Sequence, residues 1–407
     1  MSEFWNPEWE TKRIGELCDV IDPHPSHRAP EEKQDGIFFL GIGDLSEDGQ
    51  IIGSKARRVS PDIFFEHQQY YQITGNTIGF CRIASVGKVI EFKEEYPEAI
   101  TISPTLAIIE PRDIEKKFLA YCLRSRGISE QVASLSSGST RESLGIKILR
   151  DLIIPIPPLP EQKKIAEILS GIDHLILATQ RRIDRIRTAQ VGLANSWQKQ
   201  ISLEKEDGTF GDLIASIDSG WSPACDEVPP KSGEWGVLKV SAVSKGYFCE
   251  EESKRLPANL QPRDQYRIKK NDVLITRANG NLDLVGRGAI VEEEPRANLL
   301  MSDKILRLNP NPSSDRNFLL LLLNSRHVRQ QIETAVGGST GAKNIGQSLL
   351  RQISTSVPIS EDQAKIGKLS RSLSLTLSVG KKRLNYLVSL KKGLSSDLLS
   401  GCKRVSI

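Results

Sequence analysis

Residues 165–197 repeat an apolar side chain at alternating steps of four and three. The series is Ile165, Leu169, Ile172, Ile176, Thr179, Ile183, Ile186, Gln190, Leu193 and Trp197. This spacing is typical of the a and d positions of a coiled-coil helix, with Thr179 and Gln190 as polar interruptions. We therefore predict one long helix here, whose apolar seam packs against a second helix.

The same seam recurs 201 residues further along the chain. Its members are Ile366, Ser370, Leu373, Leu377, Gly380, Leu384, Leu387, Lys391, Leu394 and Leu398. Gly380 and Lys391 interrupt it where Thr179 and Gln190 interrupt the first copy. Because both the register and its defects repeat, we predict an internal duplication. Each half ends in a long helix, and the two helices pair.

Other segments repeat at nearly the same offset. Strand-like runs at 37–42 and 100–109 correspond to runs at 236–243 and 298–308, and helical patterns at 114–135 and 316–336 also correspond. This mixture predicts an α/β (α+β) fold. We expect a globule at 1–158, a long helix at 159–201, a similar globule at 202–359, a second long helix at 360–401 and a tail at 402–407. An antiparallel two-helix coiled coil with pseudo-twofold symmetry would separate the globules.

The composition is that of a soluble protein, with 38% hydrophobic and 26% charged residues among 407. No apolar run is long enough to span a bilayer. Six scattered cysteines favour reduced thiols and a cytoplasmic location. The net charge of +4 is concentrated on the helical segments, +3 over 159–201 and +7 over 360–407. The basic residues near 181–182 and 381–383 either form a solvated face or face a nucleic acid or an acidic partner.

Each half also carries a Gly-Ser-Thr turn and a polar helix start. The turns are at 138–140 and 338–340, and the helix starts are marked by Pro160 and Ser360. Glu161, Glu361 and Asp362 fall in the first helical turns, where the helix dipole favours negative charge.

The segment from the first Gly-Ser-Thr turn through Pro155-Ile156-Pro157-Pro158-Leu159-Pro160-Glu161-Gln162 resembles the specificity subunits of Type I restriction–modification systems. The second turn, Gly338-Ser339-Thr340 with Lys343-Asn344, resembles them too, although 359–363 has fewer prolines than the family favours. The resemblance implies two target-recognition domains that read an asymmetric, bipartite DNA target. It also implies a non-catalytic subunit without cofactors of its own, which binds two methyltransferase subunits and, in the full complex, restriction subunits. S-adenosylmethionine and ATP would belong to those partners.

A paired helix of about 40 residues would be roughly 60 Å long at ~1.5 Å per residue and would set the gap between two different half-sites. The candidate base-reading loop is 276–281, because arginine suits guanine and asparagine suits adenine. An ordinary turn explains this loop equally well. The residues predicted there are Thr276, Arg277, Asn279 and Asn281, with Arg287 further along.

Other candidate DNA contacts lie on loops of both halves. Possible base contacts are His24, Ser26, His27 and Arg28, their counterparts Trp221 and Ser222, and Arg82, which aligns with the 276–281 loop. Possible phosphate contacts are Lys55, Arg57, Arg58, Lys254 and Arg255, for which a solvated surface is the alternative. Ser139, Thr140, Arg141, Ser339, Thr340, Lys343 and Asn344 would either hold a phosphate or cap a helix.

For the helix pair and its partner interface we expect Ile172, Ile176, Ile183, Ile186, Gln190, Leu373, Leu377, Leu384, Leu387 and Lys391. Two other functions remain open. Asp62 followed by Glu91 and Lys93 loosely matches a metal-dependent nuclease pattern, but the second half offers no equivalent, and we predict no metal site. A coiled-coil adaptor whose globules bind proteins is the other alternative.

Overall fold

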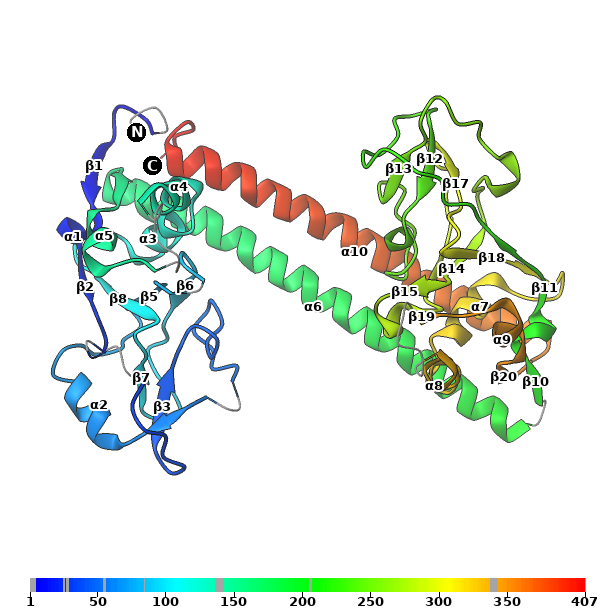
Figure 1. The fold of residues 1–407 in the computed structure, drawn as a ribbon, viewed down its shortest axis with the longest axis horizontal. Coiled ribbons are helices and arrows are strands. Elements are labelled where there is room, and N and C mark those ends of the chain that lie inside the picture. The colour runs from blue at the N-terminus through cyan, green and yellow to red at the C-terminus, as the bar shows by residue number, and fades with distance from the viewer. Residues whose placement is uncertain are drawn as a thin grey trace. The chain divides into compact units, whose positions relative to one another are not determined.

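The computed structural model describes residues 5–24, 26, 29–53, 56–83, 85–135, 143–204, 207–336 and 343–406. The chain divides into two compact units (Figure 1). The first comprises Met1–Ile176 and Tyr386–Ile407, and the second comprises Leu177–Asn385. Both dividing points fall inside the long helices α6 (Leu159–Glu204) and α10 (Ser360–Ser400). Each unit therefore holds one globule and a segment of both helices.

The first globule contains small sheets and short helices. Its strands are β1 (Glu10–Arg13), β2 (Cys18–Ile21), β3 (Ile37–Leu40), β4 (Arg58–Val59), β5 (Ile78–Cys81), β6 (Val89–Glu91), β7 (Ile100–Ile102), β8 (Leu106–Pro111) and β9 (Ile153–Ile156). Its helices are α1 (Ile14–Leu17), α2 (Pro61–His67), α3 (Lys116–Leu123), α4 (Arg126–Leu135) and α5 (Ile146–Asp151). The strand orders are β2-β8-β5-β6, β4-β3-β7 and β1-β9.

The second globule repeats this topology. Its strands are β10 (Asp207–Thr209), β11 (Ile214–Ser219), β12 (Trp235–Leu238), β13 (Ser253–Arg255), β14 (Val273–Thr276), β15 (Ala278–Asn279), β16 (Gly288–Ile290), β17 (Asn298–Leu300), β18 (Ile305–Pro310), β19 (Lys343–Asn344) and β20 (Ser354–Ser356). Its α-helices are α7 (Arg316–Leu323), α8 (Arg326–Val336) and α9 (Gln347–Gln352), and its 3-10 turns are η2 (Phe210–Leu213), η3 (Val240–Ala242), η4 (Asp264–Tyr266) and η5 (Leu282–Leu284).

Three sheets of the first globule match three sheets of the second strand for strand. The orders β11-β18-β14-β16, β13-β12-β17 and β10-β20 reproduce those of the first globule. In both, the middle strand of the three-stranded sheet pairs antiparallel on one side and parallel on the other. The predicted mixed α/β fold with two similar globules is therefore confirmed.

Several predicted runs were too long. The runs at 100–109 and 298–308 each break into two strands joined by a turn, and the helical runs each break into two helices. The run at 236–243 ends as a strand at Leu238 and continues as η3. Period-two and period-3.6 patterns run across these tight turns, so the sequence shows no break there.

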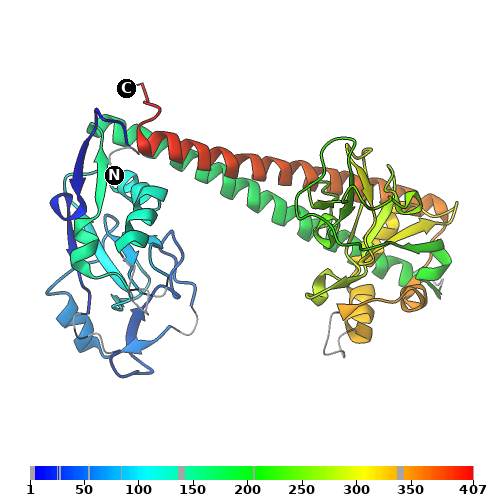
Figure 2. The ribbon, with the colours of Figure 1, turned by 45° about the horizontal axis from the view of Figure 1, so that its top comes forward.

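The two long helices run antiparallel within each unit. In the first unit, Ile165 and Leu169 near the start of α6 share a core with Leu398 and Leu399 at the end of α10. In the second unit, Gln190 near the end of α6 donates to Ser374 near the start of α10 at 3.1 Å. The views in Figures 1 and 2 both show these segments of the second unit side by side.

The predicted seam residues differ in how far they are covered. Ile172, Ile183, Leu377 and Leu387 are buried, and Ile176, Ile186, Gln190, Leu373, Leu384 and Lys391 are half-buried. At Gly380 an added Cβ would lie 3.2 Å from Cγ1 of Ile183. This glycine therefore lets the two helices of the second unit approach closely.

A buried glutamine in the first turn of each long helix makes the same contacts in both halves. Gln162 accepts a hydrogen bond from the backbone N–H of Glu115 at 2.9 Å and donates to the carbonyl of Pro157 at 2.9 Å. Gln363 makes the same two contacts with Asp315 and Pro358 at 3.2 and 2.8 Å. Each glutamine thus joins the first turn of a long helix to the N-terminus of α3 or α7.

Candidate nucleic-acid interface

Three loops of the second globule meet at the end of β14. Arg277 follows β14, Ser222 lies on the loop after β11, and Asn344 ends β19. The Arg277 Nε donates to Oδ1 of Asn344 at 3.3 Å, and its guanidinium also reaches the carbonyl of Asp303 at 3.5 Å. The Ser222 hydroxyl donates to the carboxylate of Asp303. The structure therefore brings together candidates that the sequence placed on separate loops.

A short strand pair holds this group. β15 pairs antiparallel with β19, with Asn279 opposite Lys343, and the N–H of Ile345 donates to the carbonyl of Arg277 at 2.9 Å. In the first globule the equivalent contact is a bridge between Ile83 and Ser143. Both globules thus tie the loop after β5 or β14 to the segment that follows the Gly-Ser-Thr sequence.

Thr276 requires a correction. We predicted it on the base-reading loop, but it is the last residue of β14 and is fully buried. Its hydroxyl has no hydrogen-bond partner among the described residues. Because its side chain faces the core, Thr276 is unsuited to touching a base in this conformation.

The remaining residues of the predicted loop have local partners. Asn279 Oδ1 accepts from the N–H of Asn281, and Asn281 Oδ1 accepts from the N–H of Asp283, both at 3.0 Å. Arg287 donates to the side chain of Asn324 and, through Nε, to the carbonyl of Asp283 at 3.1 Å. Burial lowers the pKa of Arg287. These contacts shape the loop and make Arg287 a support for it.

Trp221 stacks against a residue that the sequence did not single out. The guanidinium of Arg263 lies 4.3 Å from the centre of the Trp221 ring, within the range of a cation–π interaction. The backbone N–H of Trp221 donates to the carbonyl of Met301 at 2.9 Å. An exposed arginine resting on an aromatic ring suits contact with a base or a phosphate, and only the fold brings it there.

Most of the predicted phosphate contacts are engaged within the protein. Lys254 pairs with Glu227, and Arg255 pairs with Asp226 at 2.9 Å. Arg58 pairs with Glu98 at 2.9 Å and lies over the ring of Phe38, 3.9 Å from its centre. Arg57 donates to the carbonyl of Pro30 at 2.7 Å. A phosphate would have to compete with these contacts.

In the first globule, His24 and Ser26 belong to a chain of polar contacts. The Ser26 hydroxyl is 2.6 Å from Nε2 of His24, and Nδ1 of His24 is 2.9 Å from Nε2 of His67. His67 in turn contacts Thr101 on β7 at 2.5 Å. Burial lowers the pKa of His67, with His24 as a second cause. We predicted His24 as a base contact, but it is buried and anchors the loop through α2 to the sheet, whereas Ser26 is exposed.

The first-globule counterpart of Arg277 is turned inward. Arg82 is 5% exposed and pairs with Asp22 at 3.1 Å. It also donates to the carbonyl of Pro104 at 3.0 Å. We predicted Arg82 as a DNA contact, but its burial makes it a support for the loop.

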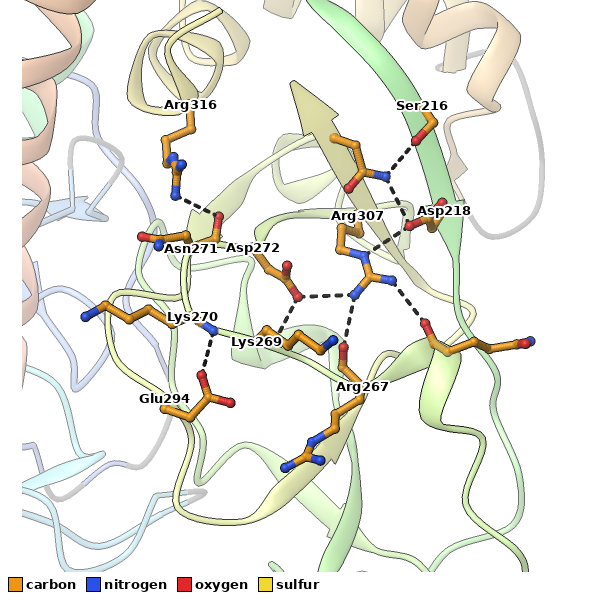
Figure 3. Close-up of polar contacts among 12 residues, drawn as sticks. Ser216, Asp218, Arg267, Lys269, Lys270, Asn271, Asp272, Glu294, Arg307 and Arg316 are labelled. Carbon is orange, nitrogen blue, oxygen red and sulfur yellow. Dashed lines mark hydrogen bonds and ion pairs between the residues drawn. The ribbon is translucent and has the colours of Figure 1, made fainter. Parts of the chain in front are cut away.

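An arginine whose side chain is 14% exposed fixes the frame beneath the loops of the second globule (Figure 3). Arg307 on β18 pairs with Asp218 on β11 at 3.1 Å and with Asp272, just before β14, at 3.2 Å. It also donates to the carbonyls of Arg267 and Gln265 at 3.0 and 3.1 Å. Asp218 is the repeat of Asp22, so the duplicated aspartate pairs with an arginine in both globules: Arg307 on β18 in the second, and Arg82, just after β5, in the first.

Eight predicted contacts lie outside the described residues. They are His27, Arg28, Lys55, Ser139, Thr140, Arg141, Ser339 and Thr340. Within the described ranges, no group of three His, Cys, Asp or Glu side chains is placed to hold a metal ion. In the same ranges, every helix is too short or too polar to cross a membrane.

Residues 6–188 and 230–387 match the family described as Type I restriction modification DNA specificity domain. The chain belongs to this family. The specificity chain is 25% identical over 299 residues to the EcoKI specificity subunit of Escherichia coli K12, covering 70% of this chain and 64% of that subunit. It is 36% identical over 160 residues to the EcoEI specificity subunit of Escherichia coli, covering 39% and 27%. These matched regions therefore span less than two thirds of those subunits.

Other relatives match over nearly their whole length. The MjaVIII specificity subunit of Methanocaldococcus jannaschii is 24% identical over a 425-residue alignment, covering 98% of this chain and 93% of that subunit. The crystal structure of a Type I specificity subunit from Mycoplasma genitalium superposes with a TM-score of 0.59 at 18% identity, covering 98% and 97%. The predicted family, and with it a specificity subunit in place of a catalytic one, is confirmed.

Proposed function

We propose that this specificity chain reads a bipartite, asymmetric DNA target, with one half-site for each globule. One observation carries the proposal: the two globules share a topology but present different chemistry on equivalent loops. On the loop after β2, Ser26 is exposed and its partner His24 is buried, whereas the loop after β11 offers Trp221 stacked with Arg263. Two globules of the same topology that differ in the side chains on these loops would recognise two different base sequences.

The group around Arg277 is our strongest candidate for base contacts. Arg277 and Asn344 are neighbours, and arginine and asparagine are the side chains that pair bidentately with guanine and adenine. The hydrogen bond between them, 3.3 Å long, would give way to bonds with bases. Lys343 and Ser222 would contact the backbone nearby.

We further propose that the two long helices set the gap between half-sites and bind two methyltransferase subunits. Restriction subunits would join in the full complex, and S-adenosylmethionine and ATP would bind to the partners. We propose domain limits at 158/159, 201/202, 359/360 and 401/402, although α6 itself continues to Glu204. The six free cysteines suit a cytoplasmic location.

Methylation mapping tests the proposal. The full chain is co-expressed with a Type I modification subunit with which it assembles, and methylated adenines in the host DNA are mapped by single-molecule sequencing. We expect one motif with two unlike halves, a fixed gap and a methylated adenine in each half. A continuous motif would rule out the bipartite reading. An assembled complex that shifts no duplex would favour the adaptor function.

A further inference from the structure

Five polar side chains of the first globule form a chain of contacts from its core to its surface. Tyr71 and Thr101 lie at the inner end, His67 and His24 follow, and Ser26 ends the chain. The first four are at most 8% exposed, whereas Ser26 is exposed. Because buried polar hydrogens need acceptors, the direction of each hydrogen bond in this chain can be worked out.

The inner end of the chain has two hydroxyl hydrogens to place. The backbone N–H of Ile102 donates to the Tyr71 hydroxyl oxygen at 3.1 Å. The Tyr71 and Thr101 oxygens are 3.0 Å apart, and one hydrogen fills the contact between them. Among the described residues, the other acceptor that these hydroxyls contact is Nδ1 of His67, 2.5 Å from Thr101 and 3.3 Å from Tyr71. One hydroxyl therefore donates to Nδ1, since a buried donor without an acceptor is unfavourable.

This donation fixes the tautomer of both histidines. A neutral imidazole carries one N–H, so His67, which accepts at Nδ1, carries its hydrogen at Nε2. Nε2 of His67 is 2.9 Å from Nδ1 of His24 and donates to it. His24 in turn carries its hydrogen at Nε2, which donates to the Ser26 hydroxyl oxygen at 2.6 Å. Ser26 therefore accepts from the protein, and its own hydrogen points away from the chain.

Both rings are neutral in this arrangement. A second proton on His24 would set two N–H groups against each other across the 2.9 Å between the rings. Burial lowers the pKa of His67, His24 lowers it further and the Glu66 carboxylate opposes both, so the His67 ring is neutral at pH 7. The Asp22 carboxylate accepts from the backbone N–H of His24 at 3.3 Å and is paired with Arg82.

We propose that this relay of hydrogen bonds fixes the Ser26 hydroxyl as a hydrogen-bond donor to DNA at the first half-site. Its partner is then an acceptor, either a base-edge atom such as purine N7, guanine O6 or thymine O4, or a phosphate oxygen. A serine without such a relay can donate or accept, so the buried residues make an ordinary hydroxyl selective. They act through Ser26 and are positioning residues. The inference rests on the proposed function in supposing that Ser26 faces DNA.

The corresponding serine of the second globule has the opposite polarity. Residues 207–315 contain no histidine, so the relay is not repeated there. Ser222, on the loop after β11, donates its hydrogen to the Asp303 carboxylate and accepts from the backbone N–H of Asp303 at 3.2 Å. Ser222 therefore offers DNA an acceptor where Ser26 offers a donor. The two loops would select opposite hydrogen-bonding groups, as two unlike half-sites require.

Nuclear magnetic resonance tests the relay without DNA. In the full chain with isotope-labelled histidine, long-range proton–nitrogen correlation spectra at neutral pH identify the protonated nitrogen of each ring, and His24→Gln and His67→Gln assign the signals. We expect a hydrogen on Nε2 of both rings, and a scalar coupling from Nε2 of His67 to Nδ1 of His24 across their hydrogen bond. A hydrogen on Nδ1 of either ring would overturn the proposal.

Methylation mapping tests the donor role of Ser26. Ser26→Ala, assembled with the modification subunit, should lower discrimination at one base position of the first half-site about tenfold, the loss expected for one hydrogen bond. If the acceptor is a phosphate oxygen, the methylation rate falls instead and every base of the motif is kept. An unchanged motif together with an unchanged rate would overturn the proposal.

The two inner hydroxyls provide a test that a merely structural role would not pass. Tyr71→Phe leaves the Thr101 hydrogen for Nδ1 of His67, and Thr101→Val leaves that of Tyr71, so each single variant should keep the wild-type methylation. The double variant lets the relay reverse and should reproduce the effect of Ser26→Ala. Tyr96→Phe, which removes another structural hydroxyl beside the same core, is the matched control and should change nothing.

A folded double variant with wild-type methylation, or single variants that each match Ser26→Ala, would overturn the relay. If the double variant does not fold, the tautomers in the unaltered chain decide. A continuous methylated motif would reject the bipartite function and leave the tautomers standing, so the two failures can be told apart.

Discussion

The Nζ of Lys391 lies 2.6 Å from the carboxylate of Asp173 in the first unit. Under the 201-residue offset these two residues correspond to Gln190 and Ser374, which hydrogen-bond to each other in the second unit. The helix pair therefore carries a polar contact at the same place in both copies, charged in one and neutral in the other. A polar pair in an apolar seam specifies register, because any slip leaves its members unpaired.

Reversing the charge at position 173 should expose this role. Asp173→Lys places two cations together and removes the acceptor for the Tyr121 hydroxyl, 2.8 Å away. Since both members of the pair are about one-third exposed, we expect a loss of about 1 kcal/mol in the free energy of unfolding, measured by urea denaturation. The double variant with Lys391→Asp should recover most of it. Failure of that rescue would show that the pair does not set the register.

Gly380 should tolerate a small side chain but not a large one. Gly380→Ala gains helix propensity of about 1 kcal/mol and meets Ile183 at 3.2 Å, so the two effects should nearly cancel. Gly380→Leu should destabilise by about 1–3 kcal/mol through overpacking. Gly171→Ala, with open space around its Cβ, should raise thermal stability. A stable Gly380→Leu variant would mean that the helices separate there without cost.

Arg307 should be among the most sensitive polar positions of the second globule. Arg307→Met removes both ion pairs and leaves the carboxylate of Asp272, only 17% exposed, without its cation. We expect a loss of about 3 kcal/mol in chemical denaturation. Arg296→Met, at a side chain that is 71% exposed, is the control and should have little effect. Equal losses for the two variants would contradict a structural role for the network.

His67 should make the stability of the chain depend on pH. Burial lowers the pKa of His67 in the folded state, so the unfolded chain binds a proton first as the pH falls through the ordinary histidine value of 6.5. Stability should therefore be highest above that pH and should decline below it. His67→Gln should flatten this part of the profile, measured as the denaturation midpoint from pH 7.5 to 5.5. An unchanged slope would assign the decline to other groups.

Arg277 should govern one half-site only. Arg277→Ala in the assembled methyltransferase should relax one base position, with a discrimination loss of about 1–3 kcal/mol, and leave the other half of the motif intact. Adenine-methylation mapping reads both halves in one experiment. Lys304→Ala, an exposed neighbour, is a control for simple loss of charge. Equal weakening on specific and random DNA would reject base reading by Arg277.

The helices and the duplication could be predicted because periodic spacing and internal repeats are visible in the sequence alone. The apolar seam is periodic, and its polar interruptions recur at an offset of 201 residues. Gln131 and Gln331 also correspond in the sequence, at an offset of 200, but their role could not be foreseen. Gln131 exchanges two hydrogen bonds with Ile153, and Gln331 does so with Ser354, so these residues hold helices to strands.

The candidate interface was less predictable because its contacts join segments far apart in sequence. Arg263 meets Trp221 only after folding, and nothing local distinguishes it from other surface arginines. A strand boundary displaced by one residue turned Thr276 from a loop residue into a core residue. The inward turn of Arg82 depends on Asp22, sixty positions earlier.

Finally, β10 and β20 pair along their length, and they stand directly after α6 and directly before α10. The chain therefore enters and leaves the second globule through two neighbouring, paired strands. Replacing the segment between β10 and β20 with that of a relative would leave α6, α10 and their connections to the globule in place. One recombination step would then change the DNA sequence that the second globule recognises, and the helices that bind the partner subunits would stay the same.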